Sequence, residues 1–186
     1  MKEYVSPDSV DFTNIEPRVI LFDGHEPNIS MSLVKEARER DIKTVLDAGS
    51  MHLGTKELIS RVDYLVCSEI FATDFTGETD EKRAVEKLYE YSGNVVITLG
   101  KRGLVWKCKS GEGALPAFTV DVVDTTGAGD VFHGAFAACI AAGKKWDYTL
   151  KFSSAAAALC CTKMSARGGI PNKEEVIALL NKANIQ

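Results

Sequence analysis

The sequence predicts an α/β fold built on a mostly parallel sheet. Short runs rich in β-branched residues alternate with longer segments whose apolar residues recur at helical spacing, the pattern of strands linked by crossover helices. Of the 186 residues, 45% are hydrophobic, so the chain is long enough to bury a sizeable core. We therefore expect one α/β domain over residues 1–186.

The first half of the chain should contain four strands, each a short apolar run. They are expected at residues 18–22, 44–47, 64–67 and 95–98. Residues 29–40 and 80–91 between them have helical spacing, with Ala84, Val85 and Leu88 on one face. These helices should pack on the sheet and link parallel strands.

The second half changes from ribbon to helices. Residues 103–120 read as a β-ribbon, because LVWKC and ALPAFTV are strand-like and KSGEG between them is a turn. Three helices should follow, at residues 131–142, 146–161 and 173–183. The first is rich in Ala and ends at Gly143, a good C-cap residue, while Pro171 and Asn172 mark the start of the last.

Composition excludes several classes of function. The net charge of −4 argues against nonspecific binding to nucleic acid, which depends on a basic surface. No apolar run reaches the roughly 18 residues of a membrane span, and the polar start MKEYVSPDS does not resemble a secretory signal. The five cysteines lack zinc spacing and read as reduced, packed thiols. We expect a cytoplasmic protein.

The run DTTGAGD, residues 124–130, combines two glycines, a carboxylate and a following apolar helix. Gly127 and Gly129 are expected just before the helix N-terminus, where unpaired N–H groups and the helix dipole favour phosphate. Glycine also lets backbone amides approach a phosphoryl group closely. Asp130 is placed to accept a proton from an attacking hydroxyl. An ordinary Asp N-cap after a glycine turn is the alternative, and the run by itself leaves both open.

Three segments together resemble the PfkB, or ribokinase-like, carbohydrate kinases. DTTGAGD with the downstream FHGAF is similar to the second signature of that family. VVITLGKRG, residues 95–103, resembles its nucleotide-binding strand and turn, and residues 152–171 resemble its adenine-side helix and closing loop. The resemblance implies a ribokinase-like fold and phosphoryl transfer from ATP to a hydroxyl of a small sugar-like substrate. It covers only the nucleotide-binding and catalytic part, without the N-terminal half and lid that supply most sugar contacts.

Carried over by position, the resemblance implies that Asp130 is the catalytic base. The backbone of Gly127, Ala128 and Gly129 would form the anion hole. Many relatives also bind a monovalent cation, here expected to be potassium, beside that hole. The matching ligands are the Asp124 side chain and carbonyls at or near Thr126, Cys160, Lys163, Ser165 and Gly169.

The same resemblance implies a set of nucleotide contacts. Thr98 and Gly100 would lie near the phosphates and ribose of ATP, and Ala157 would lie on the adenine-side helix, within an Ala run that suits either a flat base or another helix. The family often carries Asn-x-x-Glu near the metal-bound phosphates, whereas this chain has Ser68-Glu69-Ile70-Phe71. This departure leaves open how Mg²⁺ is held, and a contribution of Glu69 through water is one option.

Two classes of function stay open at this point. The first is a kinase acting on a sugar or nucleoside, and the second is a truncated or regulatory nucleotide-binding module without activity of its own. Asp23 and Asp47, after two predicted strands, suit ligand contacts or plain turns. His133 follows the expected base closely, and we expect it to lie on a helix face or to act indirectly on the site rather than to act as a catalyst. An incomplete sheet edge would favour a homodimer.

Overall fold

The computed structural model describes residue 6, residue 10 and residues 15–183. The polar start MKEYVSPDS falls almost entirely outside the described residues. One sheet of six strands runs in the order β1-β2-β3-β4-β5-β6, which confirms the predicted α/β fold. The chain divides into two compact units, Met1–Thr98 with Val105–Gly113, and Leu99–Leu104 with Ala114–Gln186.

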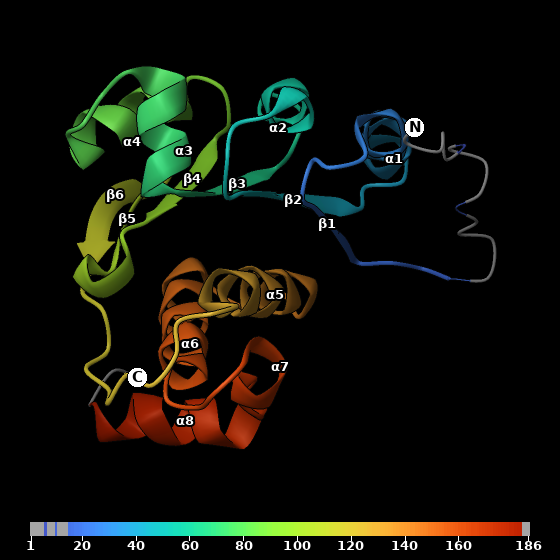
Figure 1. Cartoon of the computed structure of the whole chain (residues 1–186). Helices are drawn as coiled ribbons and strands as arrows, with labels where there is room; N and C mark the ends of the chain where they lie inside the picture. Colours follow the sequence, from blue (N-terminus) through green and yellow to red (C-terminus); the bar gives the residue numbers. More distant parts are fainter. Residues whose placement is uncertain (1–5, 7–9, 11–14, 184–186) are drawn as a thin grey trace. The chain divides into compact units, whose positions relative to one another are not determined.

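The first unit is a parallel sheet with its connecting helices. The strands β1 (Val19–Phe22), β2 (Lys43–Ala48), β3 (Tyr64–Ser68) and β4 (Asn94–Thr98) are parallel neighbours in chain order. The helices α1 (Pro27–Glu39), α2 (Leu53–Leu58), α3 (Glu69–Thr76) and α4 (Glu81–Tyr89) lie on one side of these strands (Figure 1). Right-handed crossovers between successive neighbours produce this one-sided arrangement.

The four predicted strands and the two predicted helices of this unit are confirmed, with ends shifted by up to two residues. The cores of β2, β3 and β4 are continuous apolar runs with no exposed surface, as expected for interior parallel strands. The short helices α2 and α3 were not predicted. A side-chain hydrogen bond, rather than an apolar period, marks each start: the His52 N–H donates to Thr55 Oγ1 at 3.0 Å before α2, and Ser68 Oγ accepts the Phe71 N–H at 3.0 Å before α3.

The β-ribbon is present, but its second strand is not where the sequence predicts it. β5 (Leu104–Cys108) and β6 (Gly111–Leu115) are joined by only two residues, a connection that requires an antiparallel pair. The expected turn KSGEG is therefore mostly strand. A Cβ on Gly113 would lie 3.0–3.1 Å from three indole atoms of Trp106, so the indole packs on bare backbone. Cross-strand packing outweighs the weak strand propensity of glycine here.

The second unit is mainly helical and contains α5 (Ala128–Ala141), α6 (Trp146–Cys160), α7 (Ala166–Gly169) and α8 (Lys173–Lys182). Ala155 and Ala156 of α6 are buried against Val176 and Leu180 of α8. The Ala run therefore serves helix packing at these two positions. Asn172 caps α8 as expected, since its Oδ1 accepts the Glu175 N–H at 2.9 Å.

None of the cysteines forms a disulfide, in agreement with the sequence. Cys67, Cys108, Cys139 and Cys160 are buried and Cys161 is partly buried. Burial raises the pKa of Cys139 to about 11, because the thiolate loses its solvation. Across the described residues, none of the helices combines the length and the apolar character needed to cross a bilayer.

Candidate active site

The glycine turn before α5 forms the centre of the candidate site. α5 begins at Ala128, three residues before the predicted start, with Gly127 as N-cap at φ +79° and ψ 0°. Gly127 precedes the helix as expected, but Gly129 lies with Asp130 inside its first turn, which corrects the expectation for Gly129. The Val131 N–H already donates to the Gly127 carbonyl at 2.9 Å. Asp130 is not the N-cap, so the simple capping alternative is wrong.

Backbone N–H groups at this helix start are available to an anion. The Ala128 N–H donates to the Thr125 carbonyl at 3.2 Å, whereas those of Gly129 and Asp130 donate no hydrogen bond in the part of the chain that the structure describes. A Cβ on Gly129 would meet no atom within 4 Å, so the space beside it is open. Two unpaired amides at the positive end of a helix dipole suit a phosphoryl oxygen.

Asp124 fastens the start of this turn to the loop that follows α6. Its Oδ1 accepts the N–H and the hydroxyl of Thr126 at 2.9 and 2.7 Å, and its Oδ2 accepts the Ser165 N–H at 2.9 Å. The hydrogen bond from the Thr126 hydroxyl, followed by those from the two N–H groups, lowers the pKa of Asp124. Each of these bonds favours the ionised carboxylate.

The two loops also approach each other at small residues. A Cβ on Gly127 would lie 2.6 Å from Cβ of Ala166, and a Cβ on Gly169 would lie 2.6 Å from the Cys160 carbonyl oxygen. The Cys160 thiol donates to the Thr126 carbonyl with Sγ···O at 3.9 Å. Glycine at 127 and 169 is thus required by space, and at 127 by backbone conformation as well.

The second unit therefore brings together residues predicted as cation ligands. Hydrogen bonds or close contacts link Asp124 to Thr126 and Ser165, Thr126 to Cys160, and Cys160 to Gly169. Lys163 belongs to the same loop, where its N–H donates to the Cys160 carbonyl at 3.4 Å. Its side chain turns to Glu175, at 3.2 Å. Ala166 packs on Gly127 but was not predicted as a site residue. The one hint in the sequence is its position beside the predicted loop residue Ser165.

The lowered pKa of Asp124 predicts a defined pH dependence. A carboxyl whose folded pKa lies below its unfolded pKa, about 3.9, stabilises the fold above that value and loses the contribution as pH falls through the folded pKa. Asp124→Asn should therefore be less stable than wild type at pH 7, and the difference should shrink below about pH 4. Thermal unfolding of both proteins from pH 2.5 to 8 measures this.

A matched control for that experiment is Asp121→Asn. Asp121 is exposed in the same segment and makes no hydrogen bond or ion pair among the described residues. Its variant should follow the wild-type stability curve. A constant difference between Asp124→Asn and wild type across the acid range would contradict the linkage.

In the first unit, the predicted phosphate-side residues lie at the carboxyl ends of two neighbouring strands. Ser68 ends β3 and is paired in register with Thr98, the last residue of β4. The Ser68 hydroxyl donates to the Gly49 carbonyl at 2.7 Å, and Thr98 Oγ1 donates to the Cys67 carbonyl at 3.2 Å. Glu69 opens α3 and is exposed. Ligands in open α/β sheets bind at this edge.

Gly100 and Ala157, the other predicted nucleotide contacts, belong to the second unit. Gly100 begins a 3₁₀ turn, Gly100–Arg102, with φ +57° and open space where a Cβ would be. Ala157 is half-buried on α6. Within the described residues, no hydrogen bond joins either of them to the 124–130 turn.

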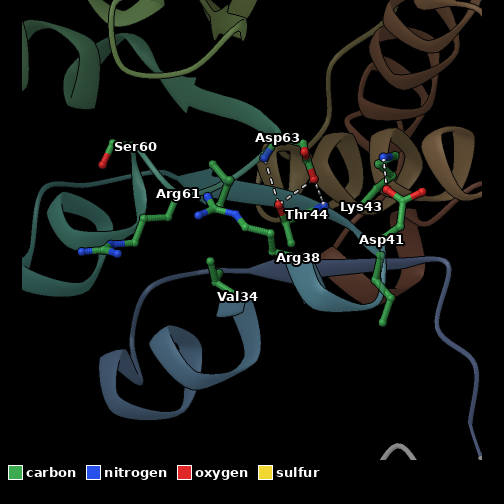
Figure 2. Close-up of a pocket in the computed structure, with 10 residues that line it drawn as sticks. Val34, Arg38, Asp41, Lys43, Thr44, Ser60, Arg61 and Asp63 are labelled. Atoms are coloured by element: carbon green, nitrogen blue, oxygen red, sulfur yellow. Dashed lines mark hydrogen bonds and ion pairs between the residues drawn. The ribbon is translucent and has the colours of Figure 1, made fainter. Parts of the chain in front are cut away.

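A separate pocket of about 150 Å³ lies at the other edge of the first unit's sheet (Figure 2). It is bordered by the end of α1, the start of β2 and the segment before β3. Two of its lining residues, Thr44 and Asp63, are hydrogen-bonded to each other, because Asp63 Oδ2 accepts both the N–H and the hydroxyl of Thr44, at 2.8 and 2.9 Å. Lying at the amino ends of the strands, the pocket is distinct from the edge that carries Ser68 and Thr98.

Comparison with known proteins identifies the family. Residues 12–173 match the pfkB family of carbohydrate kinases, and the chain belongs to this family. It is 33% identical over 153 residues to a ribokinase from Haemophilus influenzae, covering 79% of this chain and 50% of that protein. It is 35% identical over 147 residues to a ribokinase from Bacillus subtilis, covering 79% of this chain and 49% of that protein.

Solved structures agree with that assignment. The ribokinase of Thermotoga maritima superposes with a TM-score of 0.83 at 32% identity, covering 95% of this chain and 61% of that one. The Arabidopsis thaliana ribokinase complexed with ribose and ATP superposes with a TM-score of 0.78 at 30% identity, and the match covers 87% of this chain and 55% of that one. The fold is therefore ribokinase-like. The chain spans about half the length of the curated relatives it matches.

Proposed function

We propose that this chain takes part in ATP-dependent phosphoryl transfer to a hydroxyl of a small sugar-like or nucleoside substrate. The observation that carries the proposal is the first turn of α5, where the exposed Asp130 carboxylate follows the unpaired N–H of Gly129. Relatives support the choice of substrates, since the Arabidopsis ribokinase was solved with ribose and ATP. A putative ribokinase II from Escherichia coli was solved with ATP and Mg²⁺.

In the proposed reaction Asp130 accepts the proton of the substrate hydroxyl as its oxygen attacks the γ-phosphorus of ATP. The bond from that phosphorus to the bridging oxygen breaks, and ADP leaves. The N–H groups of Gly127, Gly129 and Asp130, which donate no hydrogen bond among the described residues, stabilise the charge on the transferred group, as a preformed oxyanion hole does, whereas the expected Ala128 N–H already donates to the Thr125 carbonyl. Thr98, Gly100 and Ala157 bind the nucleotide in this proposal.

Metal binding in the proposal relies on oxygen ligands. Within the described part of the chain Asp124 Oδ2 accepts a single hydrogen bond, so it keeps a lone pair for a potassium ion that nearby loop carbonyls would also bind. Ser68 and Glu69 would meet the Mg²⁺ of the nucleotide, with Glu69 acting through water. No cluster of three His, Cys, Asp or Glu side chains suited to a metal occurs among the described residues. Mg²⁺ that arrives on substrate phosphates needs only one or two carboxylates.

The alternative is a nucleotide-binding module without transfer activity, favoured by the match to only half of the relatives' length. Incubation with Mg-ATP, with and without K⁺, against ribose, fructose and nucleosides separates the two. Release of ADP that depends on one acceptor supports the kinase. ATP binding by calorimetry without transfer supports the module, and absence of both overturns both proposals.

The anion-hole role predicts a selective effect of Gly129→Val. The new side chain would enter the space proposed for phosphate, because a Cβ at 129 meets no protein atom within 4 Å. We expect ATP affinity to fall at least about tenfold, equivalent to about 1.4 kcal/mol, with little change in Tm. Titration calorimetry and thermal unfolding measure the two quantities.

Gly134→Val is the matched control for this prediction. Gly134 lies on the same helix and also has open space where a Cβ would be, but it is one turn beyond Asp130. Its variant should keep wild-type affinity. Equal affinity in both variants would mean that the glycine turn does not bind phosphate.

A further inference from the structure

His133 is a buried polar side chain one helical turn after the anion-hole glycines. It is 4% exposed on α5, and its Nδ1 lies 2.7 Å from the Gly129 carbonyl oxygen. A carbonyl oxygen only accepts hydrogen bonds, so Nδ1 carries a proton and donates it. At this distance the hydrogen bond is short.

We propose that His133 is a positioning residue that fixes the peptide unit between Gly129 and Asp130. The Gly129 carbonyl and the Asp130 N–H belong to one planar group, so a bond that holds the carbonyl also sets the direction of the N–H. The same peptide unit positions the Cα of Asp130. His133 would thus align an anion-hole donor and the base together. The inference rests on the proposed kinase function for its catalytic consequence.

Two physical arguments favour positioning over simple packing. The other buried residues of α5 are apolar, among them Phe132, Phe136 and Cys139. An apolar side chain would fill such a place without the cost of desolvating an imidazole. In addition, a hydrogen bond to the Gly129 carbonyl polarises the peptide and strengthens its N–H as a donor. That N–H belongs to Asp130, which donates no hydrogen bond in the described part of the chain.

The kinetic test compares His133→Phe, which keeps a ring but removes the donor, with His133→Asn, which keeps a donor. We expect His133→Phe to lower kcat at least about tenfold with little change in KM for ATP, and His133→Asn to recover most of the loss. A purely structural role would instead lower Tm and leave the kcat of the folded protein unchanged in both variants. That result would overturn the proposal.

A second measurement does not depend on activity. Nitrogen-15 NMR of wild type should show a proton on Nδ1 of His133, and the Asp130 amide resonance should move in His133→Phe and return in His133→Asn. An Nδ1 without a proton overturns the proposal even if His133→Phe fails to fold. If wild type transfers no phosphate but both NMR results hold, the kinase proposal fails while the positioning of the peptide stands.

Discussion

Asp130→Asn is expected to lower the rate of phosphoryl transfer by about 10²- to 10⁴-fold, the usual contribution of a positioned general base. Asparagine has the size of aspartate but does not accept the hydroxyl proton. The exposed carboxylate makes no hydrogen bond or ion pair among the described residues that the substitution would break. ATP affinity and Tm should therefore change little. Steady-state release of ADP gives kcat, and calorimetry gives the affinity.

Asp147→Asn is the matched control, because Asp147 also lies in the first turn of a helix, α6. Its carboxylate pairs with Lys151 at 2.7 Å on an exposed surface, where such a pair contributes little stability. We expect near-wild-type turnover from this variant. Wild-type turnover in Asp130→Asn as well would remove Asp130 from the mechanism.

Gly127→Ala should destabilise the fold by about 2–5 kcal/mol. A left-handed conformation costs an alanine about 1–2 kcal/mol, and Gly127 has φ +79°. The added methyl would also lie 2.6 Å from the methyl of Ala166, and such overpacking costs about 1–3 kcal/mol. Denaturant unfolding followed by circular dichroism measures the loss.

The comparison variant is Gly134→Ala, in the interior of α5 with open space around its Cα. It should gain up to about 1 kcal/mol, because alanine is the better helix former. The two glycine-to-alanine changes thus have opposite expected signs seven residues apart. If Gly127→Ala and Gly134→Ala had the same free energy of unfolding, the tight contact between Gly127 and Ala166 would be absent.

The parts of the fold that could be predicted are those with a local signal. The strands of the parallel sheet are short apolar runs, and α4 has three buried residues at helical spacing. The missed helix α2 has only six residues and depends on a capping box between His52 and Thr55. The sequence predicts β6 too late in the chain, because the strand depends on the packing of Trp106, from the neighbouring strand, on Gly113. A contact of this kind is not encoded in local composition.

The candidate site also has features that the local sequence predicts and features that depend on distant residues. The glycine turn and Asp130 could be found from DTTGAGD, since dipole, size and charge are local properties of that run. The start of α5 was placed too late, because Gly129 and Asp130 are poor helix formers that tolerate the first turn well. The hydrogen bond from the Ser165 N–H to the Asp124 carboxylate was not predicted. It joins residues 41 positions apart, beyond the reach of any sequence window.

That hydrogen bond has a consequence for the order of folding. It closes a segment containing all of α5 and α6, and closing 41 residues costs about 3 kcal/mol of chain entropy. We therefore predict that the helical hairpin of α5 and α6 forms before the hydrogen bond between Asp124 and Ser165, and that the glycine turn is organised late. A chain that has regained its helices without this hydrogen bond is expected to have full helical circular dichroism and to lack the proposed affinity for nucleotide. Recovery of ligand binding during refolding should lag behind recovery of helix.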